Sequence, residues 1–279
     1  MEPTLERLRK LIEEADAIII GAGAGLSTAA GFEYGGDFFL ENFPDIHRNY
    51  GYTDMYSAGF HDFPSSEEKW GYWSRFIYLQ RYQSGSKKLY RDLLEVVKDK
   101  NYFVLTTNVD HQFQLAGFDK KRLFYTQGDY GLFQCSKPCH NKTYDNEELI
   151  HLMVHQQRNG LIPTPLIPTC PVCGREMTTN LRSDERFVED EGWNDAAARY
   201  RRFIEENQDK NILFLELGVG FNTPGIIKYP FIRMTHAFKN AFYVCVNKGQ
   251  SYFVKDIEKK SLLLDEDINS VIEGLLSGK

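Results

Sequence analysis

The chain has 279 residues, enough for one large domain or two closely associated ones, and its hydrophobic content of 42% is ordinary for a globular protein. A formal charge of −6 argues against nucleic acid as the main partner, because binding to phosphates requires a basic surface. The first 20 residues combine a charged amphipathic segment with a short apolar run, which is typical of neither a secretion signal nor a transmembrane span. We therefore expect a cytoplasmic protein that does not bind a membrane.

Short apolar runs alternate with helical patterns along most of the chain. The runs have the length and the β-branched or aromatic composition of buried parallel strands, and they span residues 17–20, 102–107, 123–126, 212–217 and 241–246. Helical patterns occupy residues 3–14, 87–99, 195–208 and 265–278. This alternation predicts an α/β fold with an open, mostly parallel sheet.

Two stretches interrupt the alternation. Residues 32–82 contain 16 aromatic residues, which predicts a helical module whose rings either line a cleft or fill the module's own core. Residues 128–193 contain two cysteine pairs, several prolines and few regular periods, which indicates an insertion held by a metal ion. The predicted division is a nucleotide-binding domain of residues 1–31, 84–127 and 194–279, a helical aromatic-rich module of residues 32–83 and a zinc-binding module of residues 128–193.

Four of the five cysteines form two close pairs, Cys135 with Cys139 and Cys170 with Cys173. Each pair can chelate an ion from one turn, and four thiolates complete a tetrahedral structural zinc site without an open position for catalysis. The absence of an HExxH motif argues against a catalytic zinc ion. The alternative ligands, which can equally be ordinary surface histidines, are His140, His151 and His155.

A glycine-rich segment, GAGAGLSTAAG, follows the first predicted strand at residues 21–31. It does not fit the dinucleotide pattern G-x-G-x-x-G, because Leu26 occupies the third glycine position, and it lacks the Lys-Ser/Thr pair of the Walker pattern. Its small residues would allow the backbone to approach a pyrophosphate, and the Ser27 hydroxyl could donate a hydrogen bond at a helix N-terminus. A tight turn without a ligand is the alternative interpretation.

The ordered set of motifs resembles the sirtuin family over roughly residues 10–275. The set consists of GAGLSTAAG at 23–31, TTNVD at 106–110, the glycine-rich turn at 127–131, the four cysteines, ELGVGFNTPG at 216–225 and VCVNKG at 244–249. The resemblance implies a Rossmann-like parallel sheet with a smaller zinc-binding and helical module. It also implies NAD as co-substrate and either deacylase or ADP-ribosyltransferase activity.

The resemblance further assigns residues to the cofactor. The first loop would hold the pyrophosphate through Ala22, Gly23, Ala24, Gly25, Leu26 and Ser27. Asn108 and Asp110 would face the nicotinamide and its ribose. The adenosine side would be contacted by Gly218, Val219, Gly220, Asn222 and Asn247. The arginine that the family carries after the first loop is absent here, and we expect Tyr34 to substitute for it.

Gln127 occupies the position of the family's general-base histidine. Deacylation requires a base that activates a ribose hydroxyl, and a carboxamide cannot act as that base because it has no pKa near neutrality. Loss of the general base costs about 10²–10⁴ in the rate of deacylation. Transfer of ADP-ribose to an ionised carboxylate needs no base. His111, beside Asp110, is an alternative base. The charged stretch 180–193 also replaces the apolar segment that clamps an acyl-lysine peptide in the family.

The glutamine makes the chain similar to the class M branch, the microbial macrodomain-linked sirtuins. This resemblance implies a protein mono-ADP-ribosyltransferase in which Asn108, Asp110 and Gln127 are catalytic. It also implies a lipoylated carrier, similar to the glycine-cleavage H protein, as the acceptor and a macrodomain hydrolase as the functional partner. The alternatives are an NAD-dependent protein-lysine deacylase and a non-catalytic NAD-sensing adaptor.

Overall fold

The structure is a computed structural model that describes residues 2–221, 224–249 and 255–277. Its contacts divide the chain into two compact units. Unit 1 contains Met1–Gly31, Ser86–Gln127 and Glu191–Lys279, and unit 2 contains Phe32–Gly85 and Gly128–Asp190. Among the helices of the described ranges, none combines the length and the apolar character needed to cross a membrane.

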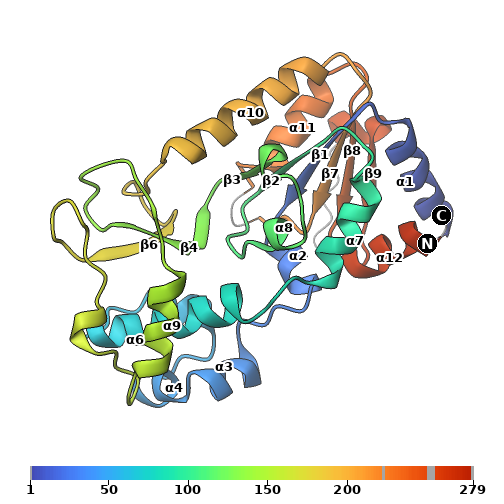
Figure 1. Cartoon of the computed structure of the whole chain (residues 1–279). Coiled ribbons are helices and arrows are strands. Elements are labelled where there is room, and N and C mark those ends of the chain that lie inside the picture. Colours follow the sequence, from blue (N-terminus) through green and yellow to red (C-terminus); the bar gives the residue numbers. More distant parts are fainter. Residues whose placement is uncertain (1, 222–223, 250–254, 278–279) are drawn as a thin grey trace. The chain divides into compact units, whose positions relative to one another are not determined.

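Unit 1 is built on a six-stranded parallel sheet with the order β3-β2-β1-β7-β8-β9 (Figure 1). The strands are β1 (Ala17–Ala22), β2 (Tyr102–Thr106), β3 (Leu123–Tyr125), β7 (Ile212–Leu217), β8 (Phe242–Val246) and β9 (Ser261–Leu264). The predicted α/β fold class is confirmed, and only β9 was not expected from the sequence. The strand order reverses between β1 and β7, and open α/β sheets bind ligands at such a reversal, beyond the carboxyl ends of the strands.

Helices cover both faces of this sheet (Figure 1). One apolar cluster joins it to α1 (Glu2–Glu14), α7 (Lys88–Val97) and α12 (Ile268–Ser277), and the other joins it to α10 (Glu191–Asn207) and α11 (Lys228–Ala237). Shorter elements are α2 (Ala24–Ala29), α8 (Gln112–Leu115), η2 (Lys120–Arg122) and η4 (Lys255–Lys260). The four helices predicted from periodicity are confirmed, and α11 is an addition.

A buried ion pair lies among the side chains of the second cluster. Glu216 on β7 and Lys228 at the start of α11 are both fully buried and contact each other directly. Tyr243 donates to Glu216 Oε2 at 2.7 Å, and the Cys245 thiol donates to Oε1 at 3.5 Å. Burial raises the pKa of Cys245 to about 12, so this thiol is protonated at neutral pH. The carboxylate of Glu216 therefore has three donors in an otherwise apolar layer.

Unit 2 combines a helical segment with a small antiparallel sheet. The helical elements are α3 (Gly36–Asn42), α4 (Pro44–Tyr50), α5 (Met55–Gly59), α6 (Ser66–Ile77) and the π-helical η1 (Tyr78–Tyr82). The sheet has the order β5-β4-β6, with β4 (Gly128–Cys135), β5 (Tyr144–Asp145) and β6 (Met177–Leu181), and is accompanied by α9 (Glu147–Gln156) and η3 (Thr164–Leu166). The sheet was not expected from the sequence, because β5 is very short and a register shift between Gly128 and Phe133 hides the alternation of β4.

The aromatic residues of the helical segment follow both predicted arrangements. Trp70 and Tyr72 are fully buried in the core of unit 2. Trp73 instead lines a cavity of about 500 Å³, together with the exposed rings of Tyr56 and Phe60. Aromatic density alone therefore could not assign each ring to the core or to a cavity wall.

Glu176 fastens helix α6 to the segment that carries the second cysteine pair. Its carboxylate accepts hydrogen bonds from Ser66 Oγ at 2.6 Å, Lys69 Nζ at 2.9 Å and Trp70 Nε1 at 2.9 Å. Burial alone would raise the pKa of Glu176, but the hydrogen bonds from Ser66 and Lys69 hold this pKa below its ordinary value. The helical and cysteine-bearing parts of unit 2 thus share one polar anchor.

Replacing Lys228 by methionine should lower the free energy of unfolding by about 3–5 kcal/mol, because Glu216 would keep a buried charge without its partner. Urea unfolding measures this change. The matched control is Lys10→Met, which removes only an exposed ion pair with Glu14 and should change stability far less. Equal stability of the two variants would contradict the assigned importance of the buried pair.

Candidate functional site

The loop after β1 packs directly against the loop after β7. The backbone N–H of Gly25 donates to Gly218 O at 2.9 Å. A Cβ added to Gly23 would lie 2.7 Å from Gly218 O, and one added to Gly25 would lie 2.8 Å from Gly218 Cα. Gly218 itself has a φ of +64°, which disfavours other residues. These glycines are therefore required by the contact between the loops, and their approach to a pyrophosphate stays a prediction.

A cavity of about 880 Å³ lies beside this contact, at the carboxyl ends of β1, β7, β8 and β9. It is lined by five of the residues that were assigned to the cofactor: Ala24, Gly25, Gly218, Gly220 and Asn247. Lys248, Glu266 and Asp267 also line it and were not singled out from the sequence. Glu266 and Asp267 follow the carboxyl end of β9, so a prediction of that strand from the sequence would have placed them beside the cavity.

The remaining assigned residues lie elsewhere. Ala22, Leu26 and Val219 are buried, so their side chains belong to the core. Tyr34 belongs to unit 2, where its ring stacks on Phe32 at 6.4 Å. Asn222 lies outside the described residues.

Asn247 fastens the cavity wall to the loop after β7. Its Nδ2 donates to Val219 O at 3.0 Å, and its backbone N–H donates to Leu264 O at 3.1 Å. A carbonyl can only accept, so this contact fixes which end of the amide faces the loop. The side-chain oxygen of Asn247 is thereby kept as an acceptor for other groups.

A buried hydrogen-bond network stands behind the first loop. The Ser27 hydroxyl donates to Asp110 Oδ2 at 2.6 Å, and the Tyr90 hydroxyl lies 3.2 Å from Ser27 Oγ and 3.4 Å from Asp110 Oδ2. The backbone N–H of Gln112 donates to Asp110 Oδ1 at 3.0 Å. Both carboxylate oxygens of Asp110 are thus engaged inside the protein, and Ser27 donates to this carboxylate instead of standing free for a pyrophosphate.

Asn108 is joined to the same network. Its Nδ2 donates to Gly23 O at 2.9 Å and to the Tyr90 hydroxyl at 3.3 Å, and its backbone N–H donates to Thr106 Oγ1 at 3.0 Å. Tyr90 lies on α7 and was not identified from the sequence, because its buried position on a helix is also that of an ordinary core aromatic residue. The structure therefore brings together Ser27, Asn108, Asp110 and Tyr90.

Gln127 lies at the same edge of the sheet as Asn108. It follows β3, which pairs in parallel with β2, and the backbone N–H of Thr126 continues that pairing to Thr106 O at 2.9 Å. Gln127 is half-buried, and its carboxamide has no hydrogen-bond partner among the residues that the structure describes. His111 precedes α8 with a φ of 64°. The edge therefore carries a half-buried carboxamide, whose role toward a substrate stays a prediction.

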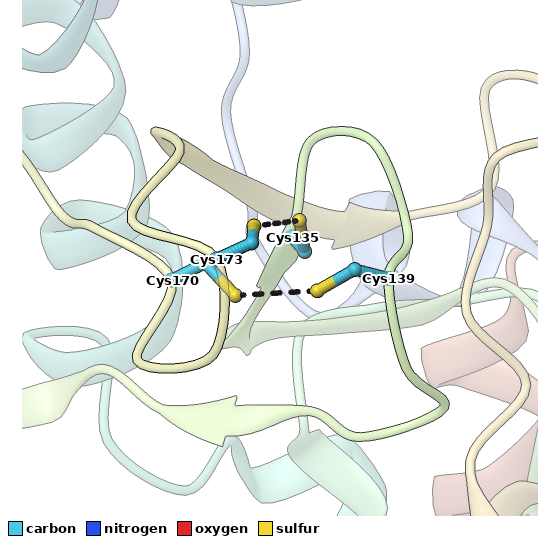
Figure 2. A group of neighbouring side chains, drawn as sticks. All are labelled: Cys135, Cys139, Cys170 and Cys173. Carbon is cyan, nitrogen blue, oxygen red and sulfur yellow. Dashed lines mark hydrogen bonds between the residues drawn. The ribbon is translucent and has the colours of Figure 1, made fainter.

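The four paired cysteines converge on one point in unit 2 (Figure 2). Their sulfur atoms all lie within 4.8 Å of one another, with 3.6 Å between Cys135 and Cys173 and 3.7 Å between Cys139 and Cys170. A tetrahedron with Zn–S bonds of about 2.3 Å has edges of about 3.8 Å. The geometry of the cluster therefore fits a zinc ion.

None of the alternative histidine ligands, His140, His151 and His155, belongs to the group of described residues that could hold a metal, although His140 contacts one of its cysteines. His140 Nδ1 lies 3.0 Å from Cys139 Sγ and its Nε2 lies 2.8 Å from the Tyr144 hydroxyl, so both ring nitrogens have neighbours. His151 packs on the rings of Tyr78 and Tyr82. Among the described residues, the group that could hold a metal consists of the four cysteines alone.

Comparisons with known proteins reveal two curated relatives. The chain is 42% identical over 268 residues to a protein ADP-ribosyltransferase of Staphylococcus aureus, an alignment that covers 96% of this chain and 85% of that protein. It is 35% identical over 239 residues to a probable bifunctional ADP-ribose hydrolase/ADP-ribosyltransferase of Fusarium oxysporum f. sp. cubense. That second alignment covers 81% of this chain but only 39% of the longer fungal protein.

Solved structures share the fold at low sequence identity. One of them, Sir2 with a p53 peptide and NAD⁺, superposes with a TM-score of 0.59 at 17% identity and covers 98% of both chains. This likeness establishes the fold only. No protein-family model matches the chain.

The cysteine cluster leads to a prediction about metal content. The wild-type chain should carry one zinc ion, measured by elemental analysis, and Cys173→Ser should carry much less, because it removes one of four thiolate ligands. Cys245→Ala, which alters a buried cysteine outside the cluster, should retain the ion. Chelation should also increase proteolysis within residues 128–190. Full zinc content in Cys173→Ser, or unchanged proteolysis after chelation, would reject the site.

Proposed function

The chain belongs to the sirtuin-type family of protein ADP-ribosyltransferases, and we propose on this basis that it transfers ADP-ribose from NAD to a protein acceptor and releases nicotinamide. The observation that carries the proposal is Gln127, a carboxamide without a partner among the described residues at the edge where a deacylase of this fold needs a base.

The cavity at the reversal of strand order is the proposed site for the adenosine part of NAD. Its size, its place beyond the carboxyl ends of the strands and its mixture of glycine backbone with polar side chains suit a nucleotide. The Asn247 oxygen and the carboxylate of Glu266 are acceptors suited to ribose hydroxyls. Ala24 and Gly25, at the start of α2, would stand beside the pyrophosphate.

Asn108 is the group that we assign to the nicotinamide ribose. When the nicotinamide bond breaks, positive charge develops on the ribose carbon, and a fixed acceptor oxygen nearby stabilises that charge. The amide nitrogen of Asn108 is held by Gly23 O and Tyr90, so its oxygen is the atom left for this purpose. Asp110 would act indirectly, through the protein groups that it holds, because both of its oxygens accept hydrogen bonds within the protein.

Gln127 would orient the ribose without removing a proton. A carboxamide donates and accepts hydrogen bonds but has no usable pKa near neutrality. Attack by an acceptor that is already ionised, such as a carboxylate, requires no base, whereas deacylation does. The proposal therefore favours ADP-ribosyl transfer over deacylation by this chain.

We further propose the partners that the resemblance implies. The acceptor would be a lipoylated carrier protein, and a macrodomain hydrolase would remove the modification. The fungal relative, whose name combines an ADP-ribose hydrolase with an ADP-ribosyltransferase, supports this pairing of activities.

We also propose a cytoplasmic location, which agrees with five cysteines that form no disulfide within the described ranges.

One comparison separates the proposed activity from its alternatives. Labelled NAD is incubated with the chain and a lipoylated carrier protein, and in parallel with an acyl-lysine peptide. Label on the carrier protein is the expected result. Removal of the acyl group would instead establish a deacylase, and tight NAD binding without turnover in either reaction would establish a non-catalytic adaptor.

The residue assignments lead to a second prediction. Asn108→Ala should lower the rate of nicotinamide release at least about 10²-fold, because a fixed acceptor at the site of developing charge is lost. Gln127→Ala should also abolish transfer. Asn240→Ala, at an exposed position that only donates to Asp209 O, is the matched control and should remain active. Full activity of either site variant, with an unchanged unfolding curve, would remove that residue from the mechanism.

A further inference from the structure

We propose that Tyr90 is a positioning residue that determines which atom of the Asn108 amide is presented to the substrate. The inference rests on the proposed function, because it concerns the orientation of a residue assigned there to catalysis. Tyr90 is fully buried, so its hydroxyl acts through its neighbours and not by contact with the substrate.

The Tyr90 hydroxyl lies at the junction of three functional side chains. It accepts a hydrogen bond from Asn108 Nδ2 at 3.3 Å, lies 3.2 Å from Ser27 Oγ and donates to Asp110 Oδ2 at 3.4 Å. An ionised carboxylate such as that of Asp110 can only accept hydrogen bonds, so the single phenolic proton of Tyr90 points toward it. The lone pairs of the phenol then face Asn108, which must offer its nitrogen and not its oxygen.

The second contact of the amide strengthens this choice. Gly23 O accepts from Asn108 Nδ2 at 2.9 Å, so both N–H bonds of the amide are used within the protein. Asn108 Oδ1 has no hydrogen-bond partner among the described residues and is not one of their buried unpaired atoms, so it reaches the surface. The amide thus presents an acceptor oxygen, as the stabilisation of positive charge requires.

Loss of the phenolic oxygen would remove one of the two contacts that hold the amide nitrogen. The amide could then rotate about its terminal torsion, which has broad and roughly two-fold preferences, and spend time with an N–H toward the substrate. That orientation repels positive charge. The substrate would still bind through the cavity, so the effect should fall on the chemical step and not on binding.

The substitution Tyr90→Phe isolates the hydroxyl. The ring of Tyr90 packs edge-on against Phe113 at 4.9 Å, and phenylalanine preserves this contact. Tyr102→Phe is the matched control, because Tyr102 is also buried and packs edge-on against Phe118 at 5.7 Å. Among the described residues, the Tyr102 hydroxyl only accepts a hydrogen bond from Asp119 N, at 3.3 Å. Both variants therefore delete one buried hydroxyl from the same unit.

The experiment measures steady-state release of nicotinamide from NAD with the lipoylated carrier protein present to accept the ADP-ribose, together with thermal unfolding, for the wild-type chain and both variants. We expect kcat of Tyr90→Phe to fall about ten-fold while KM for NAD stays within about two-fold. Tyr102→Phe should retain the wild-type kcat at a comparable melting temperature.

The outcomes separate the inference from the proposed function. A wild-type kcat for Tyr90→Phe, a rise in KM without a fall in kcat, or an equal loss in both variants would overturn the positioning role. Absence of nicotinamide release by the wild-type chain would reject the proposed function itself. A fall in kcat confined to Tyr90→Phe supports the inference.

Discussion

The direct contact between the loops after β1 and β7 is the constraint on which the candidate site depends. Gly25 N meets Gly218 O at 2.9 Å, and neither Gly23 nor Gly25 has room for a side chain. The two loops form adjoining walls of the cavity, and Gly23 also supplies the carbonyl that holds Asn108. Any residue larger than glycine would separate the loops and displace both features together.

The site uses the same device twice to orient an amide. Asn108 donates its nitrogen to Gly23 O, and Asn247 donates its nitrogen to Val219 O. In each case a backbone carbonyl of one of the two contacting loops selects the nitrogen end and leaves the oxygen for other partners. Two neutral residues thus supply fixed acceptor dipoles. For Asn108, which is joined to Asp110 through the Tyr90 hydroxyl, a carboxylate in its place would cost free energy through charge repulsion.

The sequence predicted those features that depend on short spacing or on local periodicity. The apolar run ILFLEL identified β7, and the two cysteine pairs identified a cluster whose sulfur geometry fits zinc. It did not identify Tyr90, because helical periodicity indicates that a residue is buried but not which polar atom its hydroxyl meets. Glu216 was likewise read as part of an apolar strand, since its partner Lys228 lies in a segment without a predicted element. The roles of Asn108, Asp110 and Gln127 toward a substrate stay predictions, because they concern groups outside the chain.

The position of β1 in the sheet has a consequence for how the protein is made. β1 is a central strand, and it pairs with β7 from Ala17↔Ile212 to Ala22↔Leu217. About 200 residues are synthesised between these partners, which takes on the order of 10–40 s on a ribosome. Throughout that time one edge of an entirely apolar strand has no partner, and such an edge readily pairs with other chains. The nascent chain should therefore depend on chaperones until β7 emerges, whatever the final stability of the sheet.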